Sequence, residues 1–323
     1  MLFCDIIYNM SEITKKGDVY VDFRSLTKYM DDLIKTYDIP SCDCSIYYDG
    51  INVFRYKSGY TDYEKRRRIG RRDLYFLHSA AKLVNCVAVM QLAESYKIHL
   101  NDKFSDYVDG FEADCSISEF ISCYSHTPKL EIELYNYSNT DKLIRKVTGQ
   151  SLADYAEKNI FSPLKMKSTS YKLTNKNIGR IAKQYSFEKL SGTPVEIKTN
   201  VEEIFAKNDG CLITSVDDFA LFCETICNFG KSKNKYELLT THSVKELIGS
   251  IIFSETEKED AYVCVGYNGS LVIIDLKKKI SIVYVQHMKN ITADRMHMYP
   301  ELRKTAYECI GADTWSKGYN MFP

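Results

Sequence analysis

The chain has 323 residues, of which 45% are hydrophobic and 27% are charged, values typical of a globular protein that buries a sizeable core. Lysine plus arginine and aspartate plus glutamate number 43 each, so the molecule carries no bulk field that would attract nucleic acid. No stretch approaches the roughly 20 uninterrupted apolar residues of a membrane-spanning helix, and the amino terminus lacks the basic flank and cleavage site of a signal peptide.

Eleven cysteines are scattered along the chain, an odd number without the paired framework of secreted scaffolds. We therefore expect a soluble protein of the reducing cytoplasm, with neither nucleic acid nor membrane as a partner. The close pairs Cys42/Cys44 and Cys223/Cys227 have no second pair or clustered histidine at zinc-site spacing. Buried thiols are favoured over a metal site, because free cysteine behaves mainly as a small hydrophobe.

The first predicted elements are a helix and a hairpin. Apolar residues recur at helical spacing from Leu26 to Tyr37, and Pro40 ends this amphipathic helix. Two β-rich runs follow at 44–48 and 51–56. The Asp49-Gly50 dipeptide between them is a strong hairpin signal.

A run of six basic residues lies between Lys65 and Arg72. Because the overall charge is zero and aromatic interleaving is sparse, a solvated loop is favoured over a nucleic-acid patch. A loop at this place could still shape the rim of a cleft.

A serine and a lysine three positions apart, Ser79 and Lys82, head an apolar stretch that runs on to Ala93. If the stretch is helical, the hydroxyl and the ammonium share one face, beside the unpaired N–H groups of the first turn. Apolar residues all round predict that this helix is buried. The same spacing occurs at Ser25/Lys28 and elsewhere, so the pattern alone is weak. An ordinary N-cap serine followed by an exposed lysine is the alternative.

The middle of the chain, residues 82–172, is predicted to be mostly helical. It includes a helix over Asp141–Thr148 that a glycine closes, and a capping box that begins at Ser151. Residues 175–205 are polar and irregular, which predicts a connecting segment or flap.

The last third of the chain returns to strands. After a helix over Asp217–Cys227, the apolar runs Ser270–Asp275 and Ile280–Val285 predict a second hairpin. Pro300 then opens a final helix that continues to Ile310. Strands near both ends therefore enclose a helical middle.

A phenol and an amide two residues apart, Tyr137 and Asn139, form a second polar cluster. On a loop both can point into a cleft, where the phenol relays protons and the amide binds a carbonyl or a lysine. A polar loop that caps its own helix is the alternative for this cluster taken by itself.

The order of these motifs resembles that of serine β-lactamases and penicillin-binding proteins, especially the class C and esterase branch. The segment from Ser79 to Lys82 resembles the first motif of that branch, and Tyr137 to Asn139 matches the second. Three further pieces resemble family segments in the same order: Ser125–Thr127, Asn159–Met166 and Gly210–Asp218.

The resemblance implies an α+β, β-lactamase-like fold in a single domain over residues 1–323. An antiparallel sheet built from N- and C-terminal segments and flanked by helices is expected in a lobe of residues 19–77 plus 206–323. Residues 78–205 are expected to form an inserted, mainly helical lobe.

The third motif is where the chain departs from the family, because Cys264-Val265-Gly266 stands where a Lys-Thr-Gly, a His-x-Gly or a tryptophan variant is usual. Gly266 suits a strand edge that substrate approaches closely. Cys264 cannot supply a cation for the carboxylate of a β-lactam, which favours ester or amide substrates without that group. Cys264 itself is disfavoured as nucleophile, since the motif holds no histidine to activate it.

The resemblance also implies a mechanism. Ser79 attacks a carbonyl after losing its proton to Lys82, whose pKa burial must lower, and Tyr137 relays protons to the leaving group and from water. Asn139 holds the lysine or the substrate. The backbone N–H groups of Ser79 and Tyr267 bind the oxyanion, and no metal or organic cofactor is called for.

The favoured function is a serine hydrolase that acts through an acyl-enzyme on an ester, amide or β-lactam-like carbonyl of a small-molecule or peptide-like substrate. An esterase, D-aminopeptidase or carboxypeptidase is favoured over a true β-lactamase. The alternative is a weak or inactive module that binds a peptide or cell-wall fragment, suggested by Cys264 and by Lys165 where a glycine is usual. A regulatory protein that uses the basic run is a third possibility, and the oligomeric state is open.

Overall fold

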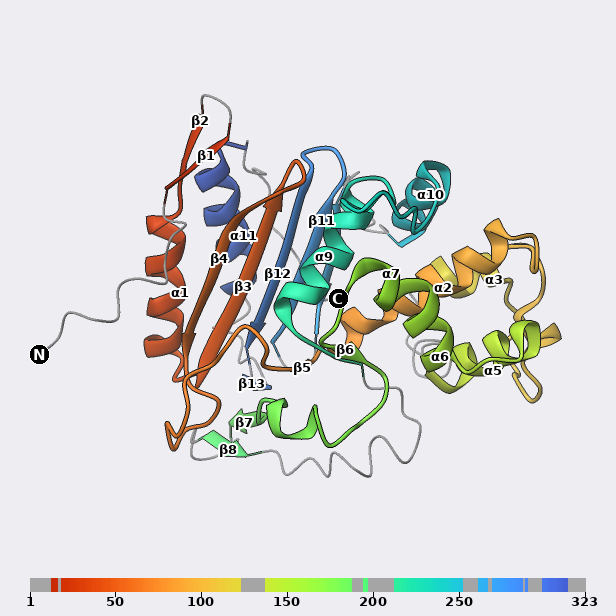
Figure 1. Ribbon diagram of the computed structural model, residues 1–323, viewed down its shortest axis with the longest axis horizontal. Helices are drawn as coiled ribbons and strands as arrows, with labels where there is room; N and C mark the ends of the chain where they lie inside the picture. The colour runs from red at the N-terminus through yellow and green to blue at the C-terminus, as the bar shows by residue number, and fades with distance from the viewer. Residues whose placement is uncertain are drawn as a thin grey trace, which may run out of the picture.

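A five-stranded antiparallel sheet, in the order β10-β11-β12-β3-β4, forms the centre of the computed structural model (Figure 1). Its strands come from both ends of the chain: β3 (Ser41–Tyr48), β4 (Ile51–Gly59), β10 (Ala261–Val265), β11 (Leu271–Asp275) and β12 (Ile280–Gln286). The predicted α+β fold is therefore confirmed. The structure describes residues 13–16, 19–122, 137–187, 194–196, 212–251, 261–266, 269–286, 288–289 and 298–312.

The first hairpin turns where the sequence predicts it. Asp49 and Gly50 have φ angles of +47° and +80°, and the strands pair from Tyr48 opposite Ile51. Two consecutive residues with positive φ give the turn that matches the right-handed twist of the flanking strands. Aspartate, like asparagine, tolerates a positive φ, and glycine adopts one freely because it has no Cβ. This dipeptide therefore suits both positions of the turn.

Alternate residues of each central strand face two different cores, which is the period-2 pattern of a sheet buried on both sides. On β12, Ile280, Ile282 and Tyr284 pack in one core, whereas Val283 and Val285 pack in the other. The first core is covered by α1 (Arg24–Thr36) and α11 (Met298–Ile310). The second contains α9 (Val216–Cys227), which crosses the front of the sheet in Figure 1, and α2 (Lys82–Glu94).

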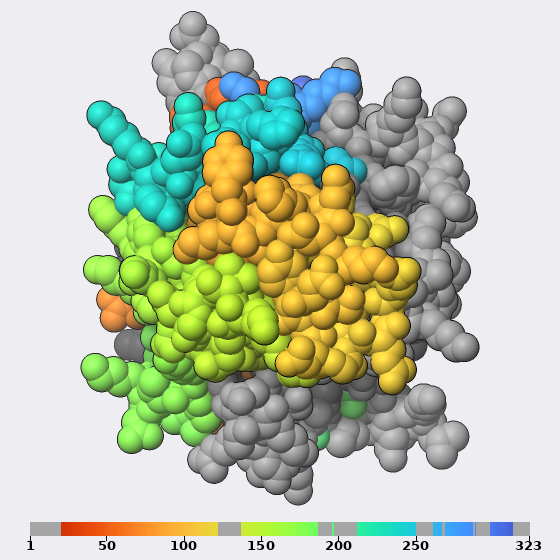
Figure 2. Space-filling view, turned by 90° about the vertical axis from the view of Figure 1, so that its right-hand side faces the viewer, coloured from red at the N-terminus to blue at the C-terminus, as the bar shows by residue number. Residues whose placement is uncertain are grey.

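The other described α-helices gather around α2 at one side of the sheet (Figure 1). They are α3 (Ile117–Ser122), α5 (Tyr137–Thr148), α6 (Leu152–Ala156), α7 (Ser162–Leu164) and α10 (Thr241–Ile251), with a π-helical turn at Glu157–Phe161. Figure 2 looks onto this end, where yellow-green α5 and α6 lie beside the orange and cyan segments. The predicted cap is present, because the Asp154 amide donates to Ser151 Oγ at 3.0 Å.

The segment predicted to be irregular, 175–205, contains short strands, so that prediction is wrong in part. β7 (Tyr185–Phe187) pairs antiparallel with β8 (Pro194–Glu196) and parallel with β13 (Met288–Lys289). Strands of two or three residues carry too little alternation to be recognised, and the partner β13 lies far away in the sequence. Residues 188–193 and 197–205 lie outside the described part.

Two further small sheets were not predicted from the sequence. One is the hairpin of β1 (Ile13–Lys16) and β2 (Val19–Asp22). The other is three-stranded and has β9 (Ile213–Thr214) at its centre, between β5 (Tyr75–Phe76) and β6 (Thr169–Ser170). This second sheet matters for function, because β5 leads directly into the segment that carries Ser79.

A buried charge cluster ties the sheet to α9 and to β5. The guanidinium of Arg55 on β4 bonds the carboxylates of Asp43 on β3 and Asp217 on α9. Burial would lower the pKa of Arg55, but the two carboxylates raise it above its ordinary value. Tyr75 Oη on β5 donates to the other oxygen of Asp43 at 3.2 Å. Through this cluster the strand that precedes Ser79 is fixed to the central sheet.

The basic run folds into a loop that acidic side chains organise. Arg67 forms a two-pronged ion pair with the buried Asp73 at 2.8 and 3.0 Å, and Arg66 bonds Asp62 at 3.0 Å. Arg71 reaches Asp217 on α9 at 2.8 Å. These pairs account for the loop structurally, while the expected lack of nucleic-acid binding stays a prediction.

Thiols in the described residues are free, and all but one are buried: Cys42, Cys44, Cys86, Cys115, Cys223, Cys227 and Cys264 are buried, and Cys309 is half-buried. Burial raises the pKa of Cys42 and of Cys223 well above the ordinary value, so these thiols remain protonated. None of the helices described is both long and apolar enough to cross a bilayer.

Glu224 on α9 is a buried carboxylate whose Oε2 has no hydrogen-bond partner in the described part of the chain. Burial raises its pKa from 4.5 to about 7, although Lys233 acts in the opposite direction. Between pH 4.5 and about 7 the unfolded chain therefore binds fewer protons at this residue than the folded chain does. The free energy of unfolding consequently falls as the pH rises through this range.

Replacement of Glu224 by glutamine is expected to stabilise the protein at pH 8 by on the order of 2 kcal/mol, and to change little at pH 4.5. Urea unfolding at the two pH values measures the difference, with the exposed Glu237→Gln as the matched control. An equal effect of Glu224→Gln at both pH values would contradict the assignment.

Candidate active site

Ser79 and Lys82 lie at the start of the buried helix α2. A 3₁₀ turn, His78–Ala81, precedes the helix and replaces the predicted α-helical first turn. Because residues i and i+3 eclipse one another in a 3₁₀ helix, the two side chains leave the backbone on the same face. Both are half-buried, while Ala80 and Ala81 between them are buried. The backbone thus places the two residues on one face of the turn, and contact between their side chains stays a prediction.

The turn before Ser79 is sharp. His78 has a φ of +46°, a left-handed conformation that residues with a Cβ adopt at a cost. It follows β5 and Leu77, whose carbonyl accepts the Ala80 amide at 3.1 Å. In the described part of the chain the hydroxyl of Ser79 makes no hydrogen bond. The half-buried serine therefore lies on a strand-to-helix turn, and its reactivity stays a prediction.

The third motif lies beside this turn, on the edge strand β10. Among the described strands, β10 pairs only with β11, and it contacts the turn that contains Ser79. Alternate residues Tyr262 and Cys264 face the core of α2. Burial raises the pKa of the Cys264 thiol, while the hydrogen bond with Tyr262 and the nearby Lys82, when charged, act to lower it. Cys264 and Lys82 are thus electrostatic neighbours.

Gly266 directly follows β10, at the start of the turn to β11. Its N–H donates to the Ser270 carbonyl at 2.8 Å, and its own carbonyl accepts the Gly269 amide at 2.9 Å. Gly269 has a φ of +86°, and a Cβ there would lie 2.3 Å from the Gln286 side chain. Tyr267, expected to supply the second oxyanion N–H, lies outside the described residues, so its role stays a prediction.

Tyr137 is the first residue of α5 and packs against the part of the molecule that borders α2. Its ring lies 5.3 Å from the ring of Tyr171, whose hydroxyl donates to Asn85 on α2 at 2.6 Å. Burial and the carboxylate of Asp141 raise the pKa of Tyr137 to about 12. The backbone amide of Ala153 donates a hydrogen bond to the Tyr137 oxygen, which lowers this pKa in part. The phenol is therefore protonated at neutral pH.

These contacts direct the Tyr137 hydroxyl to the start of α6. An approach of this hydroxyl to Ser79 and Lys82 stays a prediction. Asn139 is half-buried in the first turn of the same helix, α5. The segments Ser125–Thr127 and 210–211 of the family resemblance lie outside the described residues.

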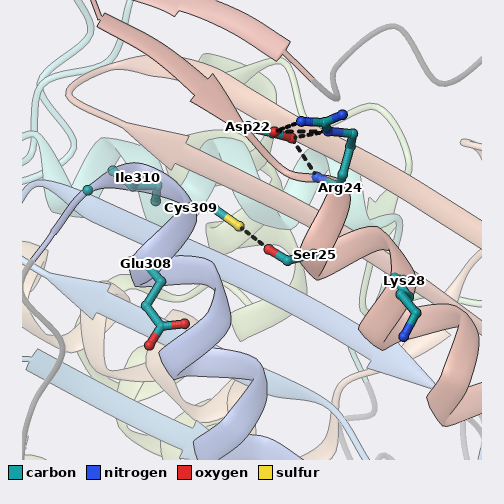
Figure 3. A pocket seen from close by; sticks show the side chains of 8 residues that line it. Asp22, Arg24, Ser25, Lys28, Glu308, Cys309 and Ile310 are labelled. Atoms are coloured by element: carbon teal, nitrogen blue, oxygen red, sulfur yellow. Dashed lines mark hydrogen bonds and ion pairs between the residues drawn. The ribbon is translucent and has the colours of Figure 1, made fainter.

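The pair Ser25 and Lys28, which has the same spacing, provides an internal comparison. It lies at the start of α1, on the other face of the sheet, in an open surface pocket that Figure 3 shows. Ser25 Oγ contacts Cys309 Sγ at 3.2 Å, and Lys28 Nζ lies 3.5 Å from Asp32 with 81% of its side chain exposed. The exposed lysine gives no basis for an activated serine there.

Two residues near Ser79 received no role from the sequence. The amide nitrogen of Gln184 lies 3.3 Å from Nε2 of His78, across 106 positions of sequence. His78 is adjacent to the candidate nucleophile, which is the signal that could have singled it out. Gln184 stands in a polar stretch and carries no such signal.

Comparison with known proteins gives the following relationships. A family model described as Beta-lactamase matches residues 26–120 and 133–306. Protein flp of Staphylococcus aureus (strain MW2) is 24% identical over 255 residues, which cover 66% of this chain and 50% of that protein. The chain thus spans about half the length of the curated relatives it matches.

Solved structures share the fold at low identity. EstCE1, described as a hydrolase with promiscuous acyltransferase activity, superposes with a TM-score of 0.68 at 15% identity, over 88% of this chain and 99% of its own. A class C β-lactamase from Rhodobacter sphaeroides has a TM-score of 0.64 at 15% identity, over 89% of this chain and 98% of its own.

Proposed function

The chain belongs to the Beta-lactamase family, as the order of its motifs predicts, and on that premise we propose that it is a serine hydrolase that acts through an acyl-enzyme. One observation carries the proposal. Ser79 and Lys82 share a face at the start of a buried helix, against the edge strand β10. This arrangement supplies a nucleophile and a base beside an edge strand, along which we expect a substrate to lie.

The first half of the proposed reaction forms the acyl-enzyme. Neutral Lys82 takes the proton from Ser79 Oγ, and the oxygen bonds the substrate carbonyl carbon, whose π electrons move onto the carbonyl oxygen. The N–H of Ser79, in the first turn, binds that oxyanion together with the N–H of Tyr267. Collapse of the intermediate breaks the bond to the leaving group, which takes the proton through Tyr137.

The second half regenerates the serine. Water loses a proton to the base, attacks the acyl carbon and releases the acid, while the proton returns to Ser79 Oγ. Since the pKa of Tyr137 is raised to about 12, this residue serves as a neutral relay rather than as a standing base. Asn139 positions Lys82 or the substrate, and the steps require no metal or organic cofactor.

The substrate class follows from Cys264. This residue faces the α2 side of the sheet and brings no cation to the site, and burial raises the pKa of its thiol. A carboxylate on the substrate therefore gains no partner from the third motif. An uncharged ester or amide, of small-molecule or peptide-like type, is the substrate that fits best.

A panel of a chromogenic cephalosporin, short aryl esters and D-amino-acid amides tests this substrate class. We expect ester kcat/KM to exceed cephalosporin kcat/KM by about tenfold or more, since one absent charge-assisted bond costs this much. Ser79→Ala serves as the control for turnover that does not use this serine. Faster cephalosporin turnover would overturn the inference from Cys264.

The second candidate is a module of the same fold that binds a peptide or cell-wall fragment without turnover. Its main support is Cys264. Lys165, the other departure from the family, has a φ of +61° and ends α7 in the conformation that usually takes glycine, so it preserves the helix end. Saturable binding of D-amino-acid peptides without any turnover would favour this candidate.

A further inference from the structure

The contact between Gln184 and His78 lies immediately before the candidate nucleophile. The Gln184 amide nitrogen is 3.3 Å from His78 Nε2, and both side chains are half-buried. His78 also has a φ of +46°, a conformation that the surrounding structure must hold in place. Gln184 therefore contacts the strained His78, the residue directly before Ser79.

Gln184 is itself presented from a fixed backbone. Two residues earlier, the Ala182 amide donates to the Leu74 carbonyl at 2.9 Å, and the Leu74 amide donates to the Arg180 carbonyl at the same distance. One residue later, the buried Tyr185 packs edge-on against Tyr63 with ring centroids 4.7 Å apart. The segment around Gln184 is thus anchored on both sides along the chain that leads to Ser79.

The chemistry of the contact suits a positioning role. A neutral imidazole that carries its proton on Nδ1 accepts a hydrogen bond at Nε2, and a primary amide donates one. Such a bond restrains the χ angles of His78, together with the contact of its ring with Phe76, and through them its left-handed backbone. Relaxation of that turn would move the Ser79 hydroxyl away from Lys82 and from the edge of β10.

We propose that Gln184 is a positioning residue, which acts through His78 to hold the turn that aims Ser79 at the substrate. The inference rests on the proposed function, since it concerns the same nucleophile. Gln184 is not assigned any contact with the reacting atoms.

Gln184→Ala is expected to lower both the aryl-ester kcat and the rate of inactivation by a fluorophosphonate by about tenfold, because small misplacement of a reacting group is costly. KM and the thermal midpoint are expected to stay within about twofold and 2 °C of the parent protein, since a half-buried polar contact adds little stability. Gln184→Glu is expected to restore most of the rate, because its carboxylate accepts from the other imidazole tautomer. Gln150→Ala is the matched control outside the site.

A second background separates positioning from a general structural effect. Glycine adopts positive φ without strain, so in His78→Gly the turn no longer depends on Gln184. Gln184→Ala is then expected to have no further effect on kcat in that background. An equal loss in both backgrounds, or a change in KM with unchanged kcat, overturns the proposal.

Failure of the underlying function has a different signature. If the parent protein shows no fluorophosphonate label on Ser79, the hydrolase assignment fails and the positioning role fails with it. If the parent protein is labelled and Gln184→Ala is labelled at the same rate, only the positioning role fails.

Discussion

Ser79→Ala is expected to lower aryl-ester turnover by on the order of 10⁴-fold or more, leaving only the residual rate that substrate binding and the oxyanion donors provide. The alanine removes the only atom that bonds the substrate carbon, and Lys82 alone offers no acyl-enzyme route. The fold is expected to be retained, because the Ser79 hydroxyl makes no hydrogen bond in the described residues. Initial rates with a p-nitrophenyl ester, together with a thermal unfolding midpoint, measure both effects.

Ser25→Ala is the matched control for this prediction. Ser25 also begins a helix three residues before a lysine, but it lies on the opposite face of the sheet and contacts Cys309. Its replacement is expected to leave ester turnover unchanged. Turnover that survives Ser79→Ala and is lost in Ser25→Ala would place the nucleophile elsewhere in the molecule.

Arg55→Met is expected to destabilise the protein by about 3–5 kcal/mol, the cost of breaking a buried ion pair by removing one partner. The Arg55 side chain is 12% exposed and that of Asp43 only 1% exposed, so the substitution leaves the Asp43 carboxylate without its cation in the interior. Asp217 loses one of its two arginine partners at the same time. Urea unfolding at pH 7 measures the change.

Arg71→Met provides the comparison for this cluster. The Arg71 side chain is 65% exposed and is the outer partner of Asp217. Its removal is expected to cost less than about 1 kcal/mol. The double variant Arg55→Met/Asp43→Asn is expected to recover part of the stability, since the unpaired charge is gone. Equal costs for Arg55→Met and Arg71→Met would contradict the buried role of Arg55.

Local signals in the sequence predicted those parts of the fold that local chemistry determines. The hairpin at Asp49-Gly50 needs two residues that tolerate positive φ, and the cap at Ser151 needs an oxygen for the Asp154 amide. The apolar run after Ser79 predicted a helix buried nearly all round, which α2 is. Each of these features depends on residues that are close together in sequence.

Features that depend on distant residues could not be predicted in the same way. The strand β7 needs β13 about a hundred positions later, and the charge cluster joins Asp43 to Asp217 through an arginine. In a single sequence, no local signal at one of these residues or strands indicates its distant partner. The contact of Gln184 with His78 is of the same kind.

The candidate site likewise combines residues that are close in sequence with residues that are far apart. Ser79 and Lys82 are three positions apart, so helix geometry alone predicts that they meet, and the structure places them on one face. Cys264 joins them only through the packing of β10, which the family resemblance implied and spacing did not. For Tyr137 the structure gives a bond from the Ala153 amide, and its convergence on Ser79 stays a prediction.

Covalent trapping with a fluorophosphonate, followed by peptide mass spectrometry, tests the central claim most directly. The account predicts one phosphonyl group per chain, located on the peptide that contains Ser79, and complete loss of the label in Ser79→Ala. Labelling of any other residue, or label that persists in Ser79→Ala, would contradict it.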